Sequence, residues 1–186
     1  MPPQAKVTRQ MILDAAFALA REEGHGAITA RRLAAKLNCS TQPILYQFDS
    51  VEQIMEETYR RADAYHTAWL LEGLEKEEEP LLALGLRYIR FGAEEKRLFC
   101  FLFQSGRFSG RSLESLFRDP GTAPLMELIR QSEGAPPEEA ARMFPALFAA
   151  AHGYASLLAN NAMAWSEQAA TEMLLTLHGM LTQERK

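Results

Sequence analysis

The sequence predicts an all-α protein, and three observations lead to this fold class. Apolar residues recur at intervals of three or four along almost the whole chain, which is the period of an amphipathic helix. No segment alternates apolar and polar residues with the period of two that marks a half-buried strand. Hydrophobic residues make up 47% of the chain and charged residues 24%, a composition typical of a globular protein, and 186 residues suffice for one domain of ordinary size or for a small domain joined to a larger one.

The first three predicted helices are short and close together in the sequence. The first ends near Gly24, Thr29 is suited to cap the second, and Ser40 is suited to cap the third. Asn38 lies at the interruption between the second and third helices. Their apolar faces are, in order, Ile12, Ala16 and Leu19; Ala30, Leu33, Ala34 and Leu37; and Ile44 and Phe48.

A longer fourth helix is predicted to begin after Ser50. Ser50 and Gln53 have the spacing of a capping box, in which each side chain accepts a hydrogen bond from the backbone of the other residue. The acidic segment 75–80 is predicted to be a solvated linker that follows this helix. The apolar positions that keep the helical period are Val51, Ile54, Met55, Ala62, Tyr65 and Trp69.

The remainder of the chain is predicted to form further helices. A long one begins at Pro136 and Pro137, because proline is favoured in the first helical turn and the acidic residues that follow suit a positive helix end. Pro145 is expected to bend this helix or to begin a new one. The other predicted elements are helices over residues 81–93, 94–104 and 166–183, a loop over 105–112 and a short helix that opens at 119–124.

Several classes of protein are disfavoured by composition. No apolar run reaches the roughly 18 residues of a membrane span, and the first ten residues lack the apolar core of a secretory signal. Cys39 and Cys100 are far apart and outside any CxxC spacing, so neither a disulfide framework nor a zinc site is expected. We therefore expect a cytoplasmic protein with no membrane partner.

The segment 29–48 carries Arg31, Arg32 and Lys36 and no acidic residue, in a chain whose net charge is −4. The first fifty residues contain six Lys or Arg against four Asp or Glu, whereas the rest contains 14 against 20. Opposite signs in the two parts indicate that they face different partners.

Two short helices joined by a tight turn have the spacing of a helix-turn-helix. That geometry places the second helix in the major groove of DNA, and an acidic residue there would be repelled by phosphates. A pair of exposed helices that is basic by chance would have the same pattern. The candidate contacts with double-stranded DNA are Thr29, Arg31, Arg32, Ser40, Thr41, Gln42, Pro43, Tyr46 and Gln47.

The sequence "ILDAAFALAREEGHGAITARRLAAKLNCSTQPILYQFDSVEQI" resembles the DNA-binding domain of the TetR/AcrR family of bacterial regulators. The resemblance covers about residues 8–58 without a gap. It rests on "ILDAA", the glycine-rich break, the pattern T-x-R-x-L-A-x-x-L, the turn, and an aromatic residue before the fourth helix. It implies a helix-turn-helix DNA-binding domain over 1–50 and a helical ligand-binding and dimerisation domain over 51–186. The expected function is that of a ligand-responsive homodimeric repressor on a palindromic operator.

Several positions depart from the family pattern. The family's usual turn glycine, recognition-helix glycine, tyrosine, histidine and fourth-helix lysine are replaced by Asn38, Gln42, Leu45, Gln47 and Val51, respectively. Asparagine tolerates a left-handed backbone, so the turn is expected to survive. Fewer phosphate contacts predict weaker DNA affinity and a flatter salt dependence. The alternative is a TetR-fold helical interaction protein with weakened or lost DNA binding.

The C-terminal helices of this family bind a small ligand and dimerise through the last two helices, and the resemblance implies the same here. An aromatic-rich segment predicts an apolar or aromatic ligand, although such a cluster is also typical of an ordinary core. The candidate ligand contacts are Tyr88, Phe91, Phe99, Phe103, Met126, His152 and Tyr154. The candidate dimer contacts are Phe148, Ala151, Ala155, Leu158, Met173, Leu177 and Leu181, although an ordinary buried core helix would have the same apolar pattern.

Nothing in the sequence indicates catalysis. It lacks GxSxG, HExxH, P-loop and GxGxxG motifs, and its four histidines have no metal-ligand spacing. We therefore expect neither an enzyme nor a metal or cofactor site.

Overall fold

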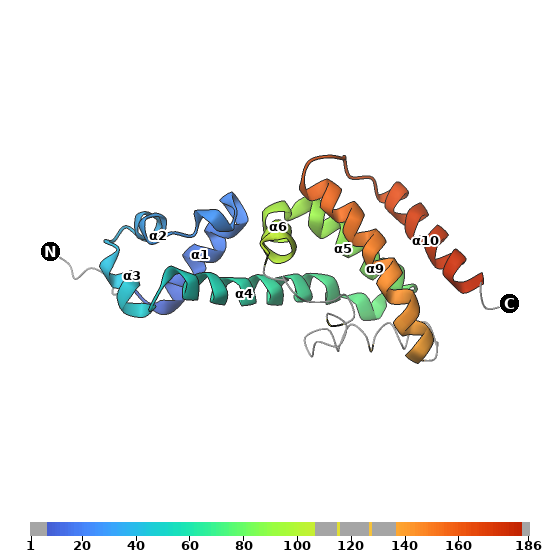
Figure 1. The fold of residues 1–186 in the computed structure, drawn as a ribbon, viewed down its shortest axis with the longest axis horizontal. Coiled ribbons are helices and arrows are strands. Elements are labelled where there is room, and N and C mark those ends of the chain that lie inside the picture. The colour runs from blue at the N-terminus through green and yellow to red at the C-terminus, as the bar shows by residue number, and fades with distance from the viewer. Residues whose placement is uncertain (1–6, 107–114, 116–126, 128–136, 184–186) are drawn as a thin grey trace. The chain divides into compact units, whose positions relative to one another are not determined.

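The computed structural model describes residues 7–106, 115, 127 and 137–183. Every regular element within these residues is helical and no strand occurs among them, which confirms the predicted all-α class (Figure 1). None of the helices in this part of the chain combines the length and apolar character that a bilayer span requires.

The chain divides into two compact units, and each is described by itself. The first consists of Met1–Tyr65 and Arg97–Ser105, and the second of His66–Lys96 and Gly106–Lys186. The division falls inside the fourth helix, whereas the predicted domains met at residue 50. The first unit holds α1 (Arg9–Glu23), η1 (His25–Ala27), α2 (Ala30–Lys36), α3 (Gln42–Gln47), most of α4 (Val51–Leu71) and α6 (Lys96–Gln104). The second holds η2 (Leu74–Lys76), α5 (Pro80–Glu94), α9 (Pro137–Ala159) and α10 (Glu167–Gln183).

Local capping residues set the ends of the first helices. The Thr8 hydroxyl accepts a hydrogen bond from the Met11 amide at 3.2 Å, and α1 ends at Gly24, whose φ of 95° suits glycine. The Thr29 hydroxyl accepts from the Arg32 amide at 3.3 Å, as predicted for the cap of α2. The apolar faces predicted for these two helices are buried, except that Ala30 and Leu37 are half-buried.

The turn after α2 depends on Asn38. Its φ is 51°, in the left-handed region, as predicted for the residue that replaces glycine here. The Cys39 amide donates to the Ala34 carbonyl at 3.0 Å, and the Asn38 amide donates to the Ala35 carbonyl at 3.2 Å. This pair of hydrogen bonds is a Schellman motif, which satisfies the last carbonyls of α2 and ends the helix.

The predicted cap of the third helix is wrong. α3 begins at Gln42 with Thr41 in the cap position, and no side chain caps it. A Ser40 cap would place Pro43 at the third helical position, and proline has no N–H to donate. The buried side of α3 is as predicted, because Ile44 and the following Phe48 are both buried.

Ser50 caps α4 in a variant of the predicted capping box. Its hydroxyl accepts from the Gln53 amide at 3.1 Å, as expected. The Gln53 side chain, however, accepts from the Asp49 amide at 2.9 Å, one residue before the cap. The backbone N–H groups of Asp49 and Gln53, which have no partner within the helix, are both satisfied in this way.

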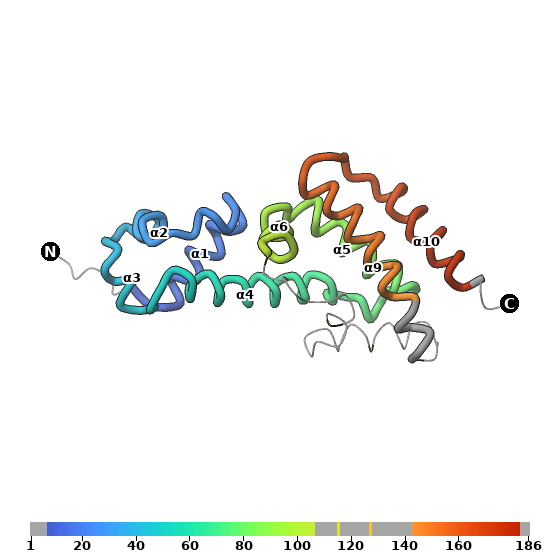
Figure 2. Tube along the Cα trace, viewed as in Figure 1, coloured from blue at the N-terminus to red at the C-terminus, as the bar shows by residue number. Residues whose placement is uncertain are grey.

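Helices α5, α9 and α10 pack side by side in the second unit (Figures 1 and 2). A Cβ atom on Gly92 of α5 would lie 2.7 Å from the Ala155 carbonyl oxygen of α9, so glycine allows the two backbones to approach closely. α9 continues through Pro145 without a break, so this proline does not begin a new helix. The predicted loop 105–112 lies mostly outside the described residues, and the predicted helix start at 119–124 lies wholly outside them.

Candidate nucleic-acid interface

The outer face of α3 exposes two large side chains beside an amide. Leu45 is 54% exposed and Tyr46 is 78% exposed. Gln42 lies one helical turn before them, and its Nε2 donates to the Tyr46 hydroxyl at 3.3 Å. Because positions i, i+3 and i+4 share one side of a helix, these three residues form a single surface, which we call the α3 face.

Arg9 connects α3 to α1 and α4. Its guanidinium group donates to the Gln47 carbonyl at 2.6 Å and pairs with Glu57 of α4. The same group lies over the ring of Phe48, the residue that ends α3. The orientation of α3 therefore depends on an arginine that was not predicted as functional, since an arginine in a first helical turn carries no distinctive sequence pattern.

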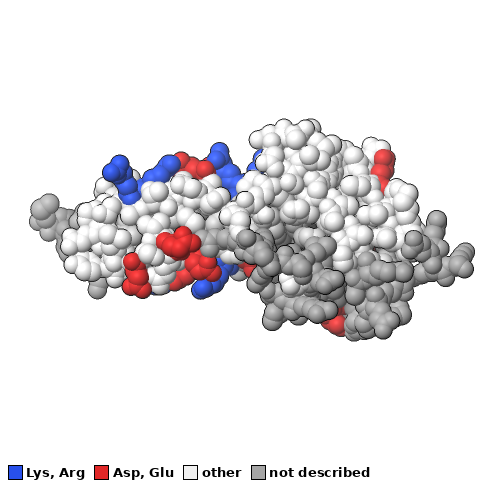
Figure 3. All heavy atoms as spheres, viewed as in Figure 1, with Lys and Arg blue, Asp and Glu red and all other residues white. Residues whose placement is uncertain are grey.

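Two ion pairs contradict the prediction that the segment 29–48 forms a basic surface without acidic neighbours. Arg32 pairs with Glu23, and Lys36 pairs with Glu22 at 2.8 Å. Both glutamates come from the end of α1, outside the segment 29–48, and Figure 3 shows basic and acidic side chains next to each other along one edge of the first unit. Exposed pairs of this kind stabilise a fold by about 0–1 kcal/mol, so a phosphate could replace either carboxylate at little cost.

Arg31 differs from the other two cations of α2. Its side chain is exposed and has neither an ion pair nor a hydrogen bond with any residue in the described part of the chain. It is therefore the cation of α2 that could meet a phosphate without first leaving a carboxylate.

The other predicted DNA contacts lie around the α3 face. Thr29, Ser40 and Thr41 are exposed, and the Thr29 hydroxyl is already engaged as the cap of α2. Pro43 and Gln47 are half-buried, and the Gln47 carbonyl is taken by Arg9. The structure thus brings Gln42 and Tyr46 together and adds Leu45, a residue that departs from the family pattern and was not among the predicted DNA contacts.

The predicted ligand contacts do not form a single cluster. Phe99 and Phe103 belong to the first unit, whereas Tyr88, Phe91, His152 and Tyr154 belong to the second. Met126 lies outside the described residues.

Tyr88 lies at the centre of a packed aromatic cluster in the second unit. Its hydroxyl lies 2.8 Å from His152 Nδ1, and its ring lies 5.5 Å from Phe148 and 5.6 Å from His66. Burial raises the pKa of Tyr88 and lowers that of His152, so the neutral form of each side chain is favoured in this contact. Burial also lowers the pKa of His66 to about 3. These contacts are those of a packed core with internal polar groups.

The predicted dimer contacts divide between the core and the edge of the second unit. Ala151, Ala155 and Leu158 are buried within this chain, and Ala155 packs against Gly92 of α5. The small side chain of Ala155 therefore belongs to a close helix contact within one chain. Phe148, Met173, Leu177 and Leu181 are half-buried.

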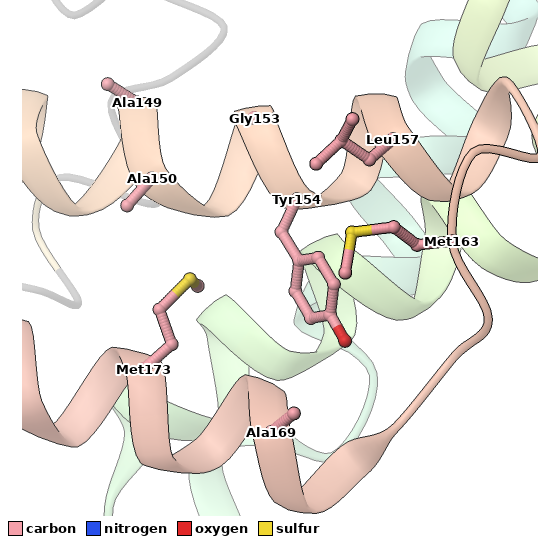
Figure 4. A pocket seen from close by; sticks show the side chains of 8 residues that line it. All are labelled: Ala149, Ala150, Gly153, Tyr154, Leu157, Met163, Ala169 and Met173. Carbon is pink, nitrogen blue, oxygen red and sulfur yellow. The ribbon is translucent and has the colours of Figure 1, made fainter.

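An apolar groove of about 470 Å³ lies between α9 and α10 (Figure 4). The ring of Tyr154 extends into it from α9, so this predicted ligand contact belongs to the groove. Leu157 and Met163 at its edge are exposed. We call this surface the α9–α10 groove. The residues that line it are Ala149, Ala150, Gly153, Tyr154, Leu157, Met163, Ala169 and Met173.

Metal-binding residues do not cluster in the described ranges, where no group of three or more His, Cys, Asp or Glu could hold an ion. A comparison with models of known protein families gave no match, and a search of curated proteins gave no significant relative.

Proposed function

We propose that this chain is a DNA-binding transcriptional regulator of the TetR/AcrR kind, which acts as a homodimeric repressor on a palindromic operator. The observation that supports it best is the arrangement of α2 and α3. α3 is held from behind by Ile44, Phe48 and the contacts of Arg9, while its outer face remains open to solvent.

The α2–α3 pair has the parts that a helix-turn-helix needs. A left-handed Asn38 ends α2, and a short connection leads to α3. In such a unit the first helix crosses the DNA backbone and the second enters the major groove. Arg31 would then meet a phosphate, and Arg32 and Lys36 would exchange their glutamates for phosphates.

Dimerisation is proposed through the α9–α10 groove. A single helix-turn-helix binds DNA weakly, whereas two recognition helices about 34–36 Å apart can bind both halves of a palindrome. The lining of the groove is apolar, and Leu157 and Met163 remain exposed in one chain. A second copy would remove these side chains from water, and the small Ala149, Ala150 and Gly153 would let helices approach closely.

Ligand response is proposed to arise in the second unit. An apolar or aromatic molecule would have to displace part of the packed Tyr88 cluster, where the Tyr88 hydroxyl and His152 already share a hydrogen bond. Such a molecule changes DNA affinity only to the extent that it prefers one conformation of the dimer.

Selection from a pool of random-sequence duplex DNA tests the proposal. The wild-type protein should enrich a defined inverted repeat, and Arg31→Ala with Arg32→Ala should bind the enriched duplex at least about tenfold more weakly. Arg60→Ala is the matched control, because Arg60 is an exposed arginine of the first unit that lies on α4. Failure to enrich any sequence would contradict DNA binding, and full binding by the double variant would exclude these two arginines as contacts.

A second candidate function is protein interaction through the same first unit. The pairing of Arg32 and Lys36 with glutamates lowers the free positive charge of α2, and the α3 face exposes Leu45 and Tyr46. Both features suit a protein partner. The DNA selection separates the two functions, since an interaction protein would enrich no sequence.

A further inference from the structure

The α3 face carries no cation. Its sequence, QPILYQ, contains neither lysine nor arginine, and the side chains that face outward are Gln42, Leu45 and Tyr46. Arginine or lysine bound to guanine is the commonest specific contact in the major groove. A recognition helix without either residue lacks the usual means of selecting a G·C pair.

The three outward side chains instead match the chemistry of an A·T pair. The major-groove edge of this pair presents N6–H and N7 of adenine and the methyl group of thymine. A glutamine amide can bind both adenine atoms, and an apolar side chain can cover the methyl group. Single exposed apolar residues are common on protein surfaces, but here a leucine and a tyrosine lie beside an amide on one helical turn.

Tyr46 orients the Gln42 amide. One N–H of Gln42 Nε2 donates to the Tyr46 hydroxyl at 3.3 Å, which leaves the second N–H and the amide oxygen available. A bidentate contact with adenine requires one donor for N7 and one acceptor for N6–H. Gln42 can therefore keep its bond to Tyr46 and still make both contacts with adenine. Tyr46 acts here as a positioning residue.

From these observations we infer that the α3 face selects A·T pairs, with Gln42 on adenine and Leu45 on the methyl group of thymine. This inference rests on the proposed function and specifies the DNA sequence that the same site prefers. It assigns a role to Leu45, which replaces a polar residue of the family pattern with an apolar one.

Replacement of thymine by deoxyuridine tests the methyl contact. The duplex enriched by the wild-type protein is resynthesised with deoxyuridine at each thymine in turn, which removes one methyl group and keeps every hydrogen-bonding group. Loss of a contacted methyl should weaken wild-type binding about fourfold. Leu45→Ala should bind the thymine and deoxyuridine duplexes equally, because it lacks the side chain that covers the methyl group. Met11→Ala, another exposed apolar residue of the first unit, should retain the fourfold difference.

The Tyr46→Phe variant tests the positioning role. It should lose preference for adenine at the position that Gln42→Ala also relaxes, while its response to deoxyuridine stays at about fourfold. Leu45 and Tyr46 are exposed, so unfolding curves should show that these variants fold normally.

Three outcomes would overturn the inference. Enrichment of G·C pairs at the positions sensitive to Gln42→Ala or Leu45→Ala would contradict it and leave the proposed function intact. An unchanged wild-type affinity for every deoxyuridine duplex would also contradict the inference and leave the proposed function intact. Failure to enrich any sequence would remove the proposed function and this inference with it.

Discussion

The guanidinium group of Arg9 lies 3.9 Å from the centre of the Phe48 ring. It also donates to the Gln47 carbonyl and pairs with Glu57, so one side chain of α1 holds the end of α3 and the start of α4 together. These contacts need the planar, multidentate geometry of arginine, which lysine lacks.

Arg9→Lys should lower the free energy of unfolding by about 1–2 kcal/mol, because it keeps the charge and loses the stacking and forked hydrogen bonds. Urea unfolding measures this change. Arg60→Lys, an exposed arginine on α4, should change the free energy of unfolding by less than about 0.5 kcal/mol. Equal effects at the two positions would show that Arg9 does not hold α3 in place.

Asn38→Ala should destabilise the protein by about 1–2 kcal/mol, since alanine is strained at the φ of 51° that ends α2. Asn38→Gly should be neutral or slightly stabilising, because glycine adopts this conformation without strain. Thermal unfolding of the two variants checks the difference. A stable alanine variant would mean that the turn does not require a left-handed residue.

Gly92→Ala should cost about 1–3 kcal/mol of stability, because the new Cβ would lie 2.7 Å from the rigid Ala155 carbonyl oxygen. Gly85→Ala is the matched control on the same helix. Its Cβ would lie 2.9 Å from the Leu174 side chain, whose end can move, so the cost should be smaller. Urea unfolding should rank the two variants in this order, and the reverse order would contradict the close packing of α5 on α9.

Glu22→Gln with Glu23→Gln should increase DNA affinity at low salt. The change frees Lys36 and Arg32 from their carboxylates and lets both meet phosphates more readily. The number of phosphates that these two cations meet in the complex stays the same, so the affinity should rise while the slope of log affinity against log salt changes little. Fluorescence anisotropy with the selected duplex measures the affinity, and Glu75→Gln in the second unit is the control. An unchanged affinity would place these cations away from the phosphates.

Stability should fall as the pH is lowered from about 6.5. The folded pKa of His66 is about 3 because the side chain is buried, whereas its ordinary value is 6.5. In this window the unfolded chain binds a proton that the folded chain does not, so the free energy of unfolding rises with pH by up to about 1.4 kcal/mol per unit. His66→Gln should flatten the profile between pH 6.5 and 5, as measured by urea unfolding at several pH values. A variant that keeps the wild-type slope would show that His66 titrates normally.

The features predicted best from sequence are those that depend on near neighbours. Thr29 and Ser50 cap their helices as expected, and Asn38 has the predicted left-handed backbone. Each involves residues within about one helical turn, where spacing and residue type largely decide the geometry. The Ser40 cap failed for an equally local reason, because Pro43 has no amide N–H.

Contacts between distant segments could not be predicted in this way. The glutamates that neutralise Arg32 and Lys36 lie on α1, and the charge of the segment 29–48 alone did not reveal them. The face of α9 that contains Ala155 was expected to meet a second chain, and it packs on Gly92 of the same chain instead. Small residues at helical spacing predict a close approach of helices but not which helix approaches.

The central claim, that the α3 face contacts DNA, is tested most directly with Tyr46→Glu. Tyr46 is 78% exposed, so the substitution should leave the unfolding midpoint unchanged while it places a carboxylate opposite the phosphates and bases. Fluorescence anisotropy with the selected duplex should show a loss of affinity of about tenfold or more. Wild-type affinity in a normally folded Tyr46→Glu protein would contradict the claim.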